Sequence, residues 1–176
     1  MRLLHWLQAK FPKRNQVFRS KYLKPFERYF GSLDYWHFHR TNVAKAVAIG
    51  LFCGLMPGPT QMLSALAVAY ILRANLPVAL FTTLYSNPLT YIPLYYLGYR
   101  IGLRILEGSS AAATHPSLQE MSHWNWDQML SWFSDVLNYL LVGIPILGIF
   151  LAASGYLLVI AAFRLYYYLE KHSSTE

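Results

Sequence analysis

Acidic residues are scarce in this sequence, and they are unevenly placed. The chain has 8 Asp and Glu against 15 Lys and Arg, and only 13% of its residues are charged. Between Tyr35 and Ile105 there is no Asp or Glu at all. A buried carboxylate for acid–base chemistry is therefore missing from this stretch, and we expect the protein not to be an enzyme.

Cysteine and the common cofactor motifs are also nearly or wholly absent. Cys53 is the one cysteine in the sequence, so no internal disulfide can form. There is no P-loop, no Rossmann glycine pattern and no CxxC pair. His37 and His39 lack the neighbouring cysteines or carboxylates that a zinc site needs, and we interpret them as interfacial. We expect neither a metal nor a cofactor.

What the sequence does contain in quantity is apolar surface. Hydrophobic residues make up 55% of the chain and aromatic residues 16%, a composition typical of a membrane protein. We predict an all-α integral membrane protein, a small helical bundle with broken or re-entrant half-helices and an N-terminal amphipathic arm. The expected domains are the arm (1–34), a membrane domain (35–168) that includes a polar loop with an interfacial helix (107–135), and a disordered tail (169–176).

The arm is basic and rich in aromatic residues. Residues 1–40 carry nine Lys or Arg against two acids. Such a segment suits the surface of an anionic leaflet, with aromatics inward and cations toward the headgroups. The alternative is a helix that packs its aromatics on the rest of the protein. We expect no nucleic-acid binding, because no recognised motif for it is present.

The residues 136–163 form an uncharged run that exceeds the roughly 20 residues needed to span a bilayer. Pro145 lies inside it, which transmembrane helices tolerate. Gly148, Ala152 and Gly155 form a small-residue face on which another helix can pack closely.

Two shorter apolar segments are each interrupted by helix-breaking residues. The runs 46–56 and 62–72 flank the sequence PGPTQ, and the runs 76–85 and 91–97 flank SNPLT. Each break carries a helix-start signal: Pro59 suits the first helical position, and Asn87 suits an N-cap before Pro88. Paired interruptions of this kind are typical of transporter binding sites. The alternative is that proline only kinks two long helices.

The stretch 42–102 resembles the DUF2062 family, a bacterial membrane-protein family known only as a numbered domain of unknown function. The marks that carry the resemblance are Gly50-Leu51-Phe52 with Gly54, Pro57 through Gln61, Arg73-Ala74-Asn75-Leu76-Pro77, and Asn87-Pro88-Leu89-Thr90 with Pro93 and Tyr95. Residues 143–156, GIPILGIFLAASGY, are similar to the family's final helix. The resemblance covers about 33–168, and it implies a bacterial inner-membrane protein without implying an activity.

The cations of the apolar region raise the question of what neutralises them. Lys45, Arg73, Arg100 and Arg104 have no acid nearby in sequence. Cations near hydrocarbon either snorkel to lipid phosphates or face a polar site. Snorkelling is the simpler interpretation of Lys45 and Arg104. For an anion-binding site at the two breaks, the candidate ligand-binding residues are Gly58, Thr60, Gln61, Arg73, Asn75, Asn87, Thr90 and Arg100.

These observations favour a small transporter or lipid-handling protein that binds a phosphate-bearing ligand at broken helices. The alternative function is a non-transporting membrane scaffold that anchors a partner protein. Expected partners are anionic membrane lipids, a lipid phosphate and further copies of this chain. We expect a multi-pass protein of the bacterial inner membrane with cytoplasmic termini. A re-entrant segment at 46–72 places the loop 107–135 in the periplasm, whereas a full crossing places it in the cytoplasm.

Overall fold

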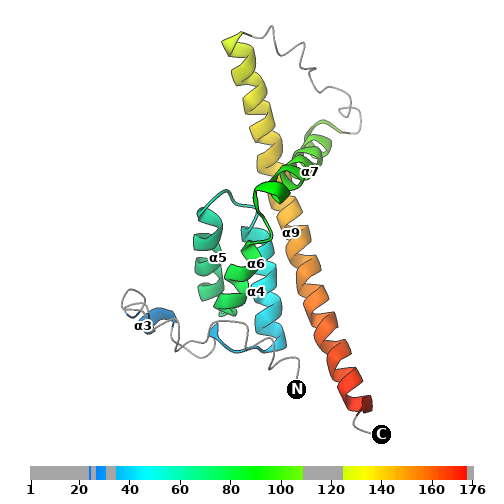
Figure 1. Cartoon of the computed structure of the whole chain (residues 1–176). Coiled ribbons are helices and arrows are strands. Elements are labelled where there is room, and N and C mark those ends of the chain that lie inside the picture. Colours follow the sequence, from blue (N-terminus) through cyan, green and yellow to red (C-terminus); the bar gives the residue numbers. More distant parts are fainter. Residues whose placement is uncertain (1–23, 25–26, 31–34, 109–124, 174–176) are drawn as a thin grey trace. The chain divides into compact units, whose positions relative to one another are not determined.

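The computed structural model describes residues 24, 27–30, 35–108 and 125–173. Helices are the only regular elements within these ranges: α3 (Glu27–Phe30), α4 (Arg40–Cys53), α5 (Thr60–Ile71), α6 (Leu76–Thr83), α7 (Pro88–Glu107) and α9 (Trp126–Ser173) (Figure 1). The predicted all-α class is confirmed. Most of the predicted arm, most of the polar loop and the last three residues lie outside the described residues.

The apolar segments are interrupted helices and not kinked ones. The first pair is split into α4 and α5, and the second into α6 and α7. A positive φ of 58° at Gly58 helps to reverse the chain between α4 and α5. The interpretation with two long, merely kinked helices is therefore wrong for these segments.

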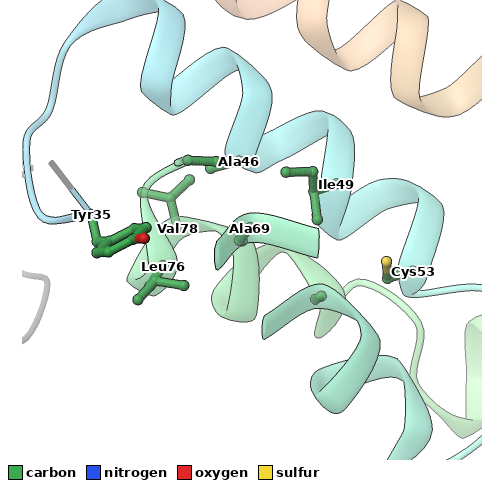
Figure 2. Packing of buried hydrophobic residues seen from close by; sticks show 10 residues of the cluster. Tyr35, Ala46, Ile49, Cys53, Ala69, Leu76 and Val78 are labelled. Atoms are coloured by element: carbon green, nitrogen blue, oxygen red, sulfur yellow. The ribbon is translucent and has the colours of Figure 1, made fainter. Parts of the chain in front are cut away.

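The chain folds as two compact units. The first unit contains the residues up to Tyr85 together with those from Leu151 onward, and the second contains Ser86–Phe150. In the first unit α4, α5 and α6 lie side by side around a small core (Figures 1 and 2). This core is built from Tyr35, Ala46, Ile49, Cys53, Ala65, Ala69, Ala74, Leu76, Val78 and Ala79.

Small residues allow the helices of the first unit to approach closely. A Cβ on Gly50 would lie 2.6 Å from the carbonyl oxygen of Ala79, so α4 and α6 nearly touch there. Gly155 of α9 packs against Val47 and Leu51 of α4. The predicted packing role is confirmed for Gly155.

In the second unit α7 crosses the first half of α9 so closely that their backbones touch. A Cβ on Gly143 would collide with the carbonyl oxygen of Gly98 and the nitrogen of Gly102. Next to this crossing the rings of Tyr99 and Tyr139 meet edge to face, with centroids 5.5 Å apart. The Tyr139 hydroxyl donates a hydrogen bond to the Glu107 carboxylate.

Among the described residues, one helix is long and apolar enough to cross a membrane, the portion Trp126–Lys171 of α9. It contains the predicted span 136–163 and extends well beyond it at both ends. The polar loop with an interfacial helix was predicted over 107–135, and its residues 126–135 are the start of α9. Residues 169–173, predicted to lie in a disordered tail, belong to the last turns of α9.

Candidate functional site

The first break holds three of the predicted site residues, Gly58, Thr60 and Gln61. The Thr60 hydroxyl donates to the carbonyl of Pro57 over 2.6 Å. The carbonyl of Gln61 accepts from Ser64 Oγ over 3.0 Å. Helix α5 begins at Thr60, so Pro59 is the N-cap residue and not the first helical residue as predicted. The hydroxyl groups of Thr60 and Ser64 are therefore used in hydrogen bonds to nearby backbone carbonyls.

The second break confirms the predicted helix start at Asn87. Its side-chain oxygen accepts from the N–H groups of Leu89 and Thr90, and Pro88 begins α7. The Thr90 hydroxyl in turn accepts from the Asn87 N–H over 2.8 Å, which completes a capping box. The cap therefore satisfies N–H groups that the predicted anion site needed as donors.

Arg73 does not join the residues of the first break. It follows α5, whereas Gly58 and Thr60 lie at the start of that helix. A helix of 12 residues is about 18 Å long. The first unit therefore holds its predicted ligand residues at two opposite ends, and Arg73 with Asn75 forms no common pocket with Thr60 and Gln61.

Asn75 is fully buried and belongs to the fold. Its side-chain oxygen accepts from the Val78 N–H over 3.1 Å and so caps α6. Its Nδ2 donates to the His37 carbonyl over 3.1 Å, and its backbone N–H donates to the Asn42 carbonyl over 3.4 Å. These bonds tie the turn after α5 to the start of α4 and the segment before it.

Arg100 lies on α7 in the second unit. Its guanidinium donates to the Tyr96 hydroxyl over 3.0 Å and sits 5.8 Å from the centroid of the Tyr96 ring. The predicted pocket combines Thr60 and Gln61 of the first unit with Asn87, Thr90 and Arg100 of the second. That combination stays a prediction.

Four cations gather at one end of the first unit, which the sequence alone did not reveal. We call this end the cationic end and define it by Arg40, Lys45, Arg73 and Arg164. From Gly155, which packs on Val47 and Leu51, α9 runs toward the end of the unit where α4 begins (Figure 1). Arg164 follows Gly155 by about two and a half helical turns in that direction. All four side chains are exposed. The opposite end, which includes 54–60 and 84–85, carries no charged side chain.

A tyrosine pair stabilises the cationic end. The ring of Tyr35 stacks on that of Tyr70 with centroids 5.6 Å apart. The Tyr35 hydroxyl donates a hydrogen bond to the Tyr70 carbonyl over 3.4 Å. Tyr35 was no candidate in the sequence, because an aromatic residue before a helix gives no signal for a partner 35 positions away.

Comparison with known proteins identifies one bacterial family. The sequence model described as "Uncharacterized protein conserved in bacteria (DUF2062)" matches residues 23–172. A search of curated proteins and a search of solved structures each returned no match. The description of the family assigns no activity.

Proposed function

The chain belongs to the DUF2062 family, and we propose that it is a multi-pass inner-membrane protein that binds phosphate-bearing lipids and helps to move them. The observation that carries this proposal is the separation of charge in the first unit. Its cations gather at one end, and its opposite end is uncharged. A leaflet of a bilayer offers the matching pair of environments, anionic phosphates above hydrocarbon.

The lengths of α4 and α5 support insertion from one side. They measure about 21 and 18 Å, whereas the hydrocarbon core is about 30 Å thick. Both helices have their polar ends near Asn42 and Asn75, which are joined by a hydrogen bond. The hairpin α4–α5 thus enters and leaves through the same leaflet.

The uncharged end of the first unit is built to tolerate a medium of low polarity. The hydroxyl groups of Thr60, Thr82, Thr83 and Tyr85 each donate to a backbone carbonyl, at 2.6 to 2.8 Å. Pro57 and Pro59 have no N–H to satisfy. Backbone groups at membrane depth must find partners within the protein, and these contacts supply several of them.

Exposed apolar side chains support the membrane location of α9. Leu141, Phe150, Leu157 and Leu158 each expose about two thirds of their surface. A surface of this kind on a helix long enough to span is suited to acyl chains. The stretch between Tyr35 and Tyr85 contains no acid, so its cations Arg40, Lys45 and Arg73 then have lipid phosphates as their counter-charges.

Lipid movement is tested with the full chain in liposomes that contain a fluorescent phosphatidylglycerol. We expect a membrane-impermeant quencher to bleach more than the outer-leaflet fraction, because lipid from the inner leaflet reaches the surface. A fluorescent glycosylceramide, which lacks phosphate, is the matched control and should stay protected. Bleaching no greater than in protein-free liposomes would contradict lipid movement and leave the scaffold function.

A further inference from the structure

The turn after α5 is a Schellman motif with an unusual residue at its left-handed position. The Ala74 N–H donates to the Ala69 carbonyl over 2.9 Å, and the Arg73 N–H donates to the Tyr70 carbonyl over 3.3 Å. Arg73 has a φ of 48°, the only positive φ of a non-glycine residue in the described part of the chain. Glycine is the common residue at this position, since a Cβ there is strained.

The described part of the fold gives no reason for arginine at this turn. The Arg73 side chain is exposed, and within the described ranges its guanidinium has no hydrogen-bond or ion-pair partner. Glycine would close the same two backbone bonds without strain. Backbone strain that the fold does not require is a mark of functional positions.

We infer that Arg73 is a binding residue for a lipid phosphate, with Arg40 as the second cation of the site. Arg73 precedes Asn75 by two residues and Arg40 precedes Asn42 by two, and the backbones of Asn75 and Asn42 are hydrogen-bonded. A guanidinium presents a planar fork of donors that matches two phosphate oxygens. This inference rests on the proposed function, which places the cationic end at the level of the headgroups.

The backbone on both sides of Arg73 is held in place by neighbouring residues. Asn75, two residues further on, is fully buried and bonded to His37 and Val78. Tyr70, three residues earlier, is stacked on Tyr35. A side chain that projects from such a turn starts from a fixed position, which lowers the entropy that binding must overcome.

The test is lipid binding to the purified full chain in detergent, measured by native mass spectrometry. The ligands are phosphatidic acid and diacylglycerol with the same acyl chains, so that they differ only in the phosphate. We expect wild type to prefer phosphatidic acid. Arg73→Gln should weaken that binding about ten- to a hundredfold, the range for loss of a charged hydrogen-bonding group. Arg104→Gln, on α7 of the second unit, should leave it unchanged.

Two further variants separate a binding role from a structural one. Arg73→Gly should lose the preference for phosphatidic acid while its melting temperature stays equal or rises, because the strain disappears. Arg73→Lys keeps the positive charge but loses the planar fork of guanidinium donors, so it should bind phosphatidic acid more weakly than wild type does. A lower melting temperature of Arg73→Gly, or an equal loss in Arg104→Gln, would overturn the inference in favour of a structural residue or of diffuse attraction.

Inorganic phosphate distinguishes a lipid ligand from a soluble anion. It should not displace phosphatidic acid at equal concentration, and displacement would show that the site takes free phosphate. The proposed function can fail separately. Liposomes in which wild type moves no lipid, while Arg73 still selects phosphatidic acid, would refute lipid movement and leave this site standing.

Discussion

Replacing Gly143 by valine is expected to force α7 and α9 apart in the second unit. The new side chain would meet the backbone of Gly98 and Gly102, and backbone atoms cannot move away by changing rotamer. Overpacking typically costs about 1–3 kcal/mol, and we expect the upper end here. For a chain of 176 residues this corresponds to a melting temperature lower by roughly 6–12 °C.

The matched control is Ala153→Val on the same helix. Ala153 is exposed, so the added methyl groups meet no packed neighbour. Its melting temperature, followed by loss of helical circular dichroism in detergent, should stay close to that of wild type. Equal melting temperatures for Gly143→Val and wild type would show that α7 and α9 do not cross at these glycines.

Replacing Asn75 by alanine is expected to destabilise the first unit by about 2 kcal/mol. Loss of an N-cap costs about 0.5–2 kcal/mol, and the carbonyl of His37 loses its donor as well. Asn75→Asp is the informative companion, because it keeps the acceptor for the Val78 N–H but loses the donor and buries a charge. It should lower the melting temperature at least as much as alanine does.

The variant Asn75→Ala also tests whether Asn75 has a ligand-binding role. The sequence places Asn75 among the ligand-binding residues, and the structure uses its side chain in a cap and a tie between segments. If Asn75→Ala keeps the wild-type melting temperature but loses selection of phosphatidic acid, Asn75 is a ligand-binding residue after all.

Local signals in the sequence were sufficient for the breaks and for one cap. Proline and glycine near Gly58, and asparagine before Pro88, act through the backbone of their immediate neighbours, so they can be recognised without knowledge of the fold. The final helix was equally evident from its uncharged length. Its extension back to Trp126 was not, because Trp126, Asp127 and Asp135 suggest an interface and say nothing about whether the helix continues.

The candidate site was less predictable, because it depends on which ends of the helices meet. Arg73 and Thr60 belong to the same short stretch of sequence, yet α5 separates them by its full length. Arg40 and Arg73 are far apart in sequence, yet the bond between Asn42 and Asn75 joins their segments. An asparagine before a helix can either bind a ligand or cap the helix, and the sequence alone favours neither role.

One signal for packing was present in the sequence and was missed. Gly98 and Gly102 are four residues apart in an apolar helix, the small-residue spacing that allows close helix contact. The small-residue spacing that predicts packing at Gly148, Ala152 and Gly155 predicts it equally for this pair. A search for the same spacing along α7 would have indicated the crossing with α9.

The depth of Thr60 in a bilayer tests whether the first unit is inserted into one leaflet. Spin labels at Thr60→Cys and at Lys45→Cys, each combined with Cys53→Ala, are compared in nanodiscs by their collision rates with oxygen and with a water-soluble nickel complex. We predict that the label at position 60 meets oxygen far more than nickel, since the uncharged end lies in hydrocarbon, and that the label at position 45 meets nickel more. Equal access of nickel to both positions would contradict insertion of the first unit into one leaflet.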